Sequence, residues 1–482
     1  MIEIDKWRTY NLRRNHLKHN MNSSRPATTA DPKSRTVGAT EHSWCKAVPG
    51  GTGITVLAIL LFKPPDLQHL QNALHKLQSS HPILNSKLHF NPAPESFSYI
   101  TPATPQIQIQ PFDLESTSKI LQTLDSGTSV SPFHSILEHE LNKNSWENPD
   151  PSSDTDLFFA SVYTLQDETW VLALRLHTSA CDRTSIAALR SELLRLMEGV
   201  ESEFTGNGEV SLGIEEYIPS GQGNKPFWAR GFDMLGYSLN SFRFSNLNFK
   251  DIVSPRGSRV IRLQFNGEET MRITSKCEDR EIKLCGLLAA AGLSACHSLK
   301  EIPVNQWEKY AVTTLIDCRS ILDPVLSGNH IGFYHSAILN SHDVNGGEDL
   351  WELAKQIYMS FMSAKNNKKH FTDMTDLNFL MCKAIENPGL TASGSLRTAV
   401  LSIFEDPIID DSSKLDEAIG LKDSIGCGSI HGVGPSIAIF DTIRDGKLDC
   451  SFVYPSPLHS REQMREFVDE MKRIILEDGF GG

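Results

Sequence analysis

Apolar residues follow two patterns along the chain, one typical of buried strands and the other of amphipathic helices. Residues 54–62 form a continuous apolar run rich in β-branched side chains, which predicts a buried strand. After Pro64-Pro65, Asp66 predicts the N-cap of a helix whose leucines recur on one face. This helix should end at His81-Pro82, because proline disfavours helical geometry in the residue before it. Residues 83–90 then return to an extended pattern.

The pattern between residues 157 and 197 predicts a strand hairpin followed by a helix. Residues 157–163 and 170–177 are strand-like, and Gln166-Asp167-Glu168 supplies the turn between them. After Asp182, apolar residues recur at helical spacing at positions 186, 189, 193 and 197. The segment Leu174–Arg183 therefore connects the end of a strand to the start of a helix. Its side chains therefore lie at the end of a strand, where a second domain can face them.

Length and pattern together predict two subdomains. At 482 residues the chain is too long for one ordinary core. We expect a disordered basic arm at 1–35, a first subdomain at 36–200, a linker or crossover at 201–257 and a second subdomain at 258–482. In the second subdomain we expect strands at 260–265, 311–316, 429–440 and 450–454, and helices at 282–299, 350–364 and 460–476.

Composition and charge exclude several classes of function. The formal net charge of −13 argues against a nucleic-acid partner, which would require a basic face. The nine cysteines form no C-x-x-C pair, which indicates reduced thiols in a cytoplasmic setting and no metal site. No apolar run approaches the roughly 20 residues that span a bilayer, so we expect no membrane span. A monomer is the expected state.

The first 36 residues differ from the rest, with eight lysines and arginines against three acidic residues. One interpretation is a disordered arm, because the segment is polar and shows little hydrophobic periodicity. The alternative is a plastid or mitochondrial transit peptide, which Glu3 and Asp5 disfavour.

Segment 174–183 carries the candidate chemistry. It reads Leu-Arg-Leu-His-Thr-Ser-Ala-Cys-Asp-Arg. It resembles the His-His-x-x-x-Asp-Gly motif of the condensation-domain and BAHD acyltransferases, the HxxxD-type superfamily that includes chloramphenicol acetyltransferase. His177 takes the first His position, Thr178 the second, Asp182 the Asp position and Arg183 the Gly position.

Other segments extend the resemblance in consistent order. Ile316–Arg319 is similar to the segment whose arginine pairs with the motif aspartate, and Gly332-Phe333 is similar to a Phe-Gly-Asn region. Gly432 and Gly434 fall on the two glycines of the family's Asp-Phe-Gly-Trp-Gly motif, which is structural rather than catalytic. The strand, leucine-rich helix and His-Pro turn near the N-terminus resemble the opening of condensation domains.

The resemblance implies an α/β fold of two chloramphenicol acetyltransferase-like subdomains, each a mixed sheet flanked by helices, with a tunnel between them. An acyl thioester such as acyl-CoA is the implied co-substrate, and an alcohol or amine the acceptor. No covalently bound cofactor is implied. The second histidine removes the acceptor's proton, because its pKa lies close to operating pH. Asp182 is implied to be structural and to pair with Arg319 across the subdomains.

Thr178 departs from this chemistry, because a hydroxyl is a poor proton acceptor near neutral pH and losing a general base costs about 10²- to 10⁴-fold in rate. The candidate substitute bases are His177, His335 and His431. Cys181 would need a nearby base to act as a nucleophile, and none is evident. It is therefore expected to be a buried structural thiol, and Ser179 and Thr184 are expected to be loop and capping groups.

Two functions remain open. One is an acyl-CoA-dependent O- or N-acyltransferase with an altered active site. The other is a catalytically inactive binding or interaction module on the same fold. A histidine, His335 or His431, within hydrogen-bond reach of Thr178 across an open tunnel would favour the first function, and a closed tunnel the second.

Overall fold

The computed structural model describes residues 33–124, 130–200, 209–226, 244–300, 302–303, 305–411 and 413–479. The expected basic arm therefore lies almost wholly outside the described residues. The chain is already in a strand at Lys33, three residues before the first subdomain was expected to begin. Of the expected linker, 201–208 and 227–243 also lie outside the described part.

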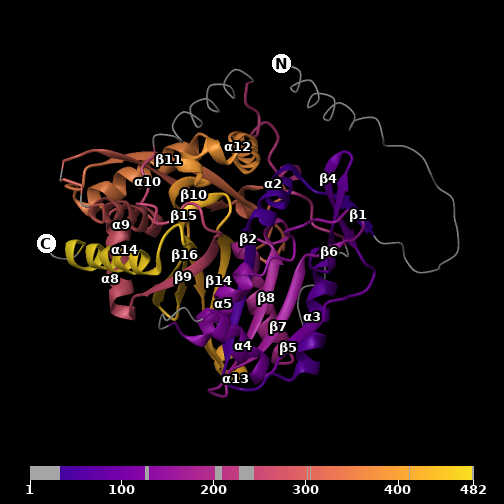
Figure 1. Cartoon of the computed structure of the whole chain (residues 1–482). Coiled ribbons are helices and arrows are strands. Elements are labelled where there is room, and N and C mark those ends of the chain that lie inside the picture. Colours follow the sequence, from indigo (N-terminus) through magenta and orange to yellow (C-terminus); the bar gives the residue numbers. More distant parts are fainter. Residues whose placement is uncertain are drawn as a thin grey trace.

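The first part of the chain (Figure 1, indigo to magenta) forms a four-stranded sheet and four strands of a five-stranded sheet, whose edge strand β14 (Leu421–Ile430) comes from the second part. The four-stranded sheet has the order β1-β4-β3-β6, and the larger sheet the order β14-β2-β8-β7-β5. The elements, in chain order, are β1 (Lys33–Thr36), α2 (Ala39–Ala47), β2 (Thr52–Leu61), α3 (Leu67–Ser80), β3 (Lys87–Pro92), β4 (Glu95–Thr101), β5 (Ile109–Phe112), α4 (Leu114–Leu124), α5 (Pro132–Asn142), β6 (Thr155–Asp156), β7 (Phe158–Thr164), β8 (Trp170–His177) and α6 (Arg183–Met197).

The second part builds a mixed seven-stranded sheet in the order β11-β10-β12-β15-β16-β9, with β13 paired to β15. Its elements, in chain order, are β9 (Gly257–Gln264), α8 (Gly267–Asp279), α9 (Leu284–Ser298), β10 (Glu308–Asp317), β11 (His335–Val344), α10 (Leu350–Asn366), α11 (Lys369–Thr372), α12 (Met374–Glu386), β12 (Arg397–Phe404), β13 (Ile408–Asp410), α13 (Ser413–Ile419), β14 (Leu421–Ile430), β15 (Gly434–Arg444), β16 (Lys447–Ser456) and α14 (Arg461–Arg473).

The apolar run at 54–62 forms most of strand β2, and the surroundings of β2 explain why the run is continuous. Side chains alternate across a strand, and both faces of β2 are covered. Leu57 and Ile59 face the core that includes α3 and α6. Val56 and Ala58 face the core that α5 forms with strands of the second part. The second of these cores joins the two parts of the molecule.

Strand β14 differs from the expected division of the chain into two separate subdomains. It belongs to the second part of the sequence, but it pairs along its length with β2, at the edge of the first sheet. The prediction of a single strand at 429–440 is wrong, because this stretch contains the end of β14 and the start of β15, which belong to different sheets. The chain leaves the first sheet after Ile430, turns at 431–433, and enters the second sheet as β15.

One further expectation was wrong, and one helix was not predicted at all. Residues 83–90 were expected to be extended, but Pro82–Asn85 form a 3₁₀ turn before β3. The pattern also gave no signal for α8, because only Thr270, Ile273 and Cys277 of this charged helix are buried. The helix predicted after Asp66 is present as α3, and Asp66 caps it by accepting hydrogen bonds from the main-chain N–H groups of Gln68 and His69.

Within the segment expected to be a linker, Ile214 and Glu215 contact both parts of the chain. Ile214 is fully buried. The Glu215 carboxylate accepts hydrogen bonds from the main-chain N–H and the hydroxyl of Thr40, each at 2.6 Å, at the N-terminus of α2. A carboxylate at this end of a helix is stabilised by the unpaired N–H groups of its first turn. The segment therefore helps to fix α2 against the rest of the fold.

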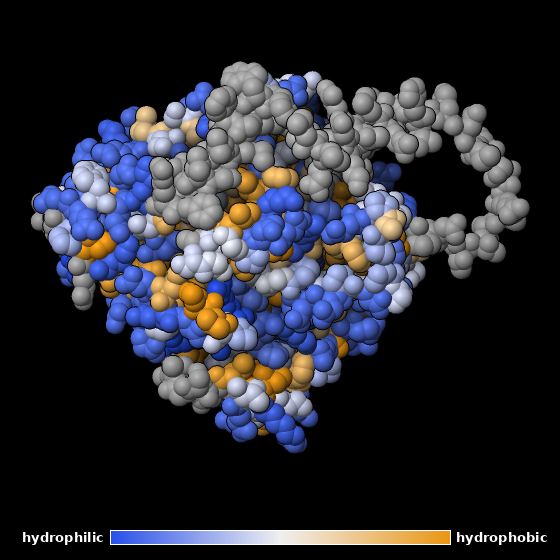
Figure 2. All heavy atoms as spheres, turned by 45° about the horizontal axis from the view of Figure 1, so that its top comes forward, coloured by the Kyte–Doolittle hydropathy of each residue, from blue (hydrophilic) through white to orange (hydrophobic). Residues whose placement is uncertain are grey.

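The face of the molecule seen in Figure 2 is largely hydrophilic, with separate patches of hydrophobic residues. Among the residues that the structure describes, no helix has both the length and the apolar character needed to cross a membrane.

Candidate functional site

The motif segment lies where the sequence placed it, between the end of β8 and the start of α6. Thr178–Ala180 form a 3₁₀ turn, and Asp182 is the N-cap of α6. The Asp182 carboxylate accepts a hydrogen bond from the main-chain N–H of Ser185 at 2.8 Å. This cap satisfies one of the free N–H groups of the first helical turn and fixes the motif loop to the helix.

The expected cross-domain pair between Asp182 and Arg319 is present. Arg319 Nη1 lies 2.9 Å from Asp182 Oδ2, and Nη2 donates to Oδ1 at 3.0 Å. The main-chain N–H of Tyr334 also donates to Oδ2, and Nδ1 of His335 lies 3.0 Å from the same oxygen. Burial alone would raise the pKa of Asp182, but the positive charge of Arg319 and the contact with His335 outweigh it and hold that pKa below its ordinary value.

Arg319 has further partners around this carboxylate. It donates to Oδ1 of Asp317 at 3.0 Å, to the hydroxyl of Ser185 at 2.9 Å and to the main-chain oxygen of His330 at 3.1 Å. Both side chains of the pair are almost completely buried, at 3% and 1% exposure. A buried ion pair is stable only when its remaining donors and acceptors are also bonded, and this one meets that requirement.

His177 is completely buried at the end of β8. Its Nδ1 accepts a hydrogen bond from the main-chain N–H of Ser179 at 3.1 Å and lies 2.7 Å from the Ser179 hydroxyl. Tyr99 donates to that hydroxyl at 2.7 Å, and the imidazole packs edge-on against Trp146. Nε2 is buried and has no hydrogen-bond partner in the described chain. Burial lowers the pKa of His177 to about 3, so the ring is neutral at pH 7.

We expect His177 to make stability depend on pH. An unfolded histidine has a pKa of about 6.5, so between pH 6.5 and 3 the unfolded state binds a proton that the folded state does not. Stability is therefore fully present above pH 6.5 and falls as the pH is lowered. From pH 7 to pH 5 this one group should remove about 2 kcal/mol from the free energy of unfolding.

Urea unfolding at the two pH values checks this expectation. His177→Asn keeps an acceptor for Ser179 but cannot take up a proton, so its loss between pH 7 and pH 5 should be smaller by about 2 kcal/mol. Ser179→Ala is the control, because it removes the hydroxyl and leaves the buried ring, and its pH dependence should match the wild type. An equal loss in His177→Asn and the wild type would contradict the assignment.

Thr178 is the residue that the motif resemblance aligns with a general base. Its hydroxyl lies 2.6 Å from the hydroxyl of Thr55 on β2, a hydrogen bond buried inside the protein. Gly53 passes close by with a φ of +96°, and a Cβ at Gly53 would come within 3.2 Å of Thr178 Cβ. The threonine is thus held by β2, and its hydroxyl is part of the protein's internal packing.

The two histidines from the second part lie against groups other than Thr178. His335, the first residue of β11, lies against Asp182, and its ring packs edge-on against Phe404. Nδ1 of His431 lies 3.0 Å from the Ser258 hydroxyl. Burial, together with the charge of Arg397, lowers the pKa of His431 to about 4. Within the described chain, the recorded hydrogen bond of the Thr178 hydroxyl is to Thr55 rather than to either histidine.

The loop that carries Gly432 and Gly434 is held by a buried arginine. Arg397 donates to the main-chain oxygens of Ile430, Gly432 and Pro435. A Cβ at Gly432 would lie 2.4 Å from the main-chain oxygen of Gly50, so only glycine fits this close approach of two backbones. The geometry agrees with the structural role that the resemblance implied for this segment.

The remaining polar residues of the motif are also structural in their contacts. Cys181 is fully buried, and burial raises the pKa of its thiol well above the ordinary value. The Thr184 hydroxyl donates to Oδ2 of Asp317 at 2.8 Å. Among the described residues, no group of His, Cys, Asp and Glu is arranged to hold a metal ion.

Sequence reasoning did not identify two residues that shape the site. Thr55 lies in the middle of an apolar strand, and nothing in that pattern marks it as the partner of Thr178. Arg183 was recognised at the glycine position of the motif, but its side chain was given no role. In the structure it crosses to the second part and pairs with Asp441.

Comparison with solved structures shows the fold. The trichothecene 15-O-acetyltransferase TRI3 from Fusarium sporotrichioides is 12% identical, with a TM-score of 0.67, covering 95% of this chain and 100% of that one. Polyketide synthase associated protein 5 from Mycobacterium tuberculosis is 14% identical, with a TM-score of 0.63 and coverage of 93% and 99%. The condensation domain of the Monacolin K polyketide synthase MokA is 10% identical, with a TM-score of 0.61 and coverage of 94% and 99%.

These likenesses extend over nearly the whole chain, so the protein has the two-part α/β fold of condensation domains and related acyltransferases. No family model matches the sequence, and no curated protein matches it. The resemblance read from the motif is thus confirmed at the level of the fold, in a chain whose sequence has diverged far from these structures.

Proposed function

We propose that this protein is a binding module on the acyltransferase fold, which holds a small ligand without base-assisted acyl transfer. The observation that carries the proposal is the hydrogen bond between the hydroxyls of Thr178 and Thr55. Where the family's mechanism requires a proton acceptor, this chain has a hydroxyl already bonded to its own β2 strand. Acyl transfer from a thioester without that acceptor would be slower by about 10²- to 10⁴-fold.

The neighbouring histidines support the same proposal. His177 is neutral and buried, with Nδ1 bonded to Ser179 and Nε2 packed without a polar partner in the described chain. His431, in the loop after β14, lies within hydrogen-bond distance of Ser258 on β9. A general base must come within hydrogen-bond reach of the proton that it removes. In the described part of the chain, neither imidazole forms a hydrogen bond with Thr178, whose hydroxyl is bonded to Thr55.

The direct test measures binding and turnover of acyl-CoA by the wild-type chain. Acetyl-, malonyl-, octanoyl- and benzoyl-CoA would be titrated by calorimetry, and release of free CoA would be followed by mass spectrometry with panels of alcohols and amines. We expect saturable binding of at least one compound and CoA release no faster than without protein. Protein-dependent CoA release would contradict the proposal. Failure of all four compounds to bind would exclude acyl-CoA as the ligand class.

A specific contact favours one alternative, an acyltransferase that uses His335. Its Nδ1 is buried 3.0 Å from the Asp182 carboxylate but makes no hydrogen bond in the described chain. A small rotation of the ring would align Nδ1–H with this carboxylate, and the other nitrogen could then accept a proton. If the wild type does release CoA, His335→Gln should reduce that rate at least 10²-fold. An unchanged rate in His335→Gln would exclude this alternative.

A further inference from the structure

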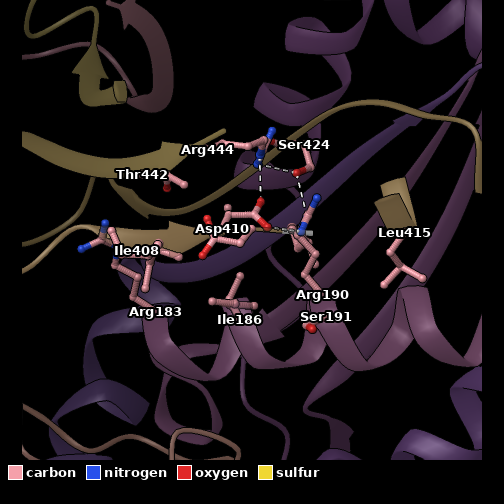
Figure 3. A pocket seen from close by; sticks show the side chains of 15 residues that line it. Arg183, Ile186, Arg190, Ser191, Ile408, Asp410, Leu415, Ser424, Thr442 and Arg444 are labelled. Atoms are coloured by element: carbon pink, nitrogen blue, oxygen red, sulfur yellow. Dashed lines mark hydrogen bonds and ion pairs between the residues drawn. The ribbon is translucent and has the colours of Figure 1, made fainter. Parts of the chain in front are cut away.

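A cavity of about 610 Å³ lies between α6 of the first part and strands β13, β14 and β15 of the second (Figure 3). One side of its lining is apolar and includes Leu57, Ile186 and Ile408. The other side is polar: Asp410 accepts hydrogen bonds from Arg190 at 2.9 Å and from Arg444 at 2.8 Å. The lining charges around Asp410 are therefore paired, and the cavity fits an amphipathic molecule rather than a strongly charged one.

Arg183 is the point at which this cavity meets the motif. Of the ten residues at 174–183, Arg183 alone is among the residues that line the cavity. Figure 3 shows it at the start of the helix whose later turns carry Ile186 and Arg190. The motif that this segment resembles has glycine here, which would leave the same space without a side chain.

The Arg183 side chain is fixed to the second part of the chain. It donates to the Asp441 carboxylate at 2.9 Å, to the main-chain oxygen of Asp441, and to the main-chain oxygen of Asp406 at 3.0 Å. Its guanidinium lies 4.1 Å from the centre of the Phe404 ring, a cation–π contact. The side chains of both Arg183 and Asp441 are buried, at 7% and 1% exposure.

The residues on either side of Arg183 hold it in this position. Asp182 is paired with Arg319, and Thr184 donates to Asp317. Three consecutive side chains thus bind the second part. Arg183 cannot swing away from the cavity without breaking a buried ion pair, because its backbone is fixed on both sides.

We propose that Arg183 is a barrier between this cavity and the motif, so that an amphipathic small molecule in the cavity is held away from Thr178. The inference rests on the proposed function, because it gives the ligand of a non-catalytic relative a site of its own. The apolar part of such a molecule lies against Leu57 and Ile186, and its polar part reaches Thr442 and Arg444.

The proposed barrier can be tested without acyl-CoA by measuring how fast a small reagent labels a cysteine introduced at position 178. Thr178→Cys would be introduced together with Cys382→Ser, because Cys382 is the partly exposed cysteine and the other eight are buried. The probe is methanethiosulfonate ethylammonium. The thiolate introduced at position 178 attacks the sulfur of the probe to form a mixed disulfide, while methanesulfinate leaves. Mass spectrometry follows the rate.

Removing Arg183 alone would leave the buried Asp441 carboxylate without its ion-pair partner, and this would destabilise the folded protein. The test variant is therefore Arg183→Gly with Asp441→Asn, and Asp441→Asn alone is the matched control. We expect labelling to be at least tenfold faster in the double variant than in Asp441→Asn. Equal labelling rates in the double variant and in Asp441→Asn would overturn the proposal that Arg183 is a barrier. CoA release by the wild type would instead overturn the proposed function, so the two failures are distinguishable.

Discussion

Arg319→Met is expected to lower the free energy of unfolding by about 3–5 kcal/mol, the largest stability effect that we expect from a single substitution in this chain. It removes the guanidinium and leaves the Asp182 carboxylate at 1% exposure without its principal countercharge. The partners of Arg319 come from both parts of the chain, so the loss should also weaken the contact between the parts. Urea unfolding of the full chain at pH 7 measures it.

A double-mutant cycle with Asp182→Asn separates the pair from its surroundings. Asparagine can still cap α6, so Asp182→Asn removes the charge and retains much of the helix cap. The double variant should cost less than the sum of the two single variants, because each single change leaves one buried charge uncompensated. Lys119→Met is the control, since the Lys119 side chain is 69% exposed and its pair with Glu115 should contribute only about 0.3–0.5 kcal/mol. Strict additivity in the cycle would show that Asp182 and Arg319 do not act together.

The local pattern of the sequence predicted those elements whose burial is regular. β8 and α6 were predicted because their apolar residues recur with the periods of a strand and a helix, and Asp182 marked the point where one becomes the other. The same reasoning gave α3 with its cap at Asp66. It did not give α8, which buries too few residues to show a period.

The path of the chain between the two sheets could not be predicted from the pattern. β14 and β15 read as one strand because serine, glycine and apolar residues continue across the turn at 431–433. The feature that separates them is the pairing of β14 with β2, which joins residues more than 350 positions apart. Nothing local in either strand records that pairing.

The candidate site was predictable only where the family resemblance supplied a partner. Asp182 and Arg319 are 137 residues apart, and the motif-based expectation paired them correctly. Thr55 lies 123 residues from Thr178, and Asp441 lies 258 residues from Arg183. At these two positions the chain departs from the motif. The residues that compensate for each departure could be identified only from their contacts.

Under the proposed function, two departures from the motif, Thr178 and Arg183, oppose acyl transfer in different ways. Thr178 replaces the proton acceptor with a hydroxyl bonded to Thr55, and Arg183 places a side chain in the cavity lining where the motif has glycine. If both matter, correcting one should have little effect while the other remains. We expect Thr178→His alone to show at most a small gain in CoA release from acyl-CoA.

The combined variant Thr178→His/Arg183→Gly/Asp441→Asn should release CoA about 10²- to 10⁴-fold faster than Arg183→Gly/Asp441→Asn, since a general base contributes a factor of that size. The added rate should rise with pH through the ordinary imidazole pKa of about 6.5, because only the neutral ring accepts a proton. Mass spectrometry of released CoA measures both effects with the acyl-CoA and acceptor panels used for the wild type.

The matched control for this variant places glutamine at position 178 in the same background. Glutamine is close to histidine in size and hydrogen bonding but takes up no proton, so it should show no gain and no dependence on pH. Thermal unfolding must show that both variants remain folded, because the new side chain has to fit beside Thr55 and Gly53. Equal rates for histidine and glutamine in folded protein would contradict the prediction that a base at position 178 accelerates CoA release.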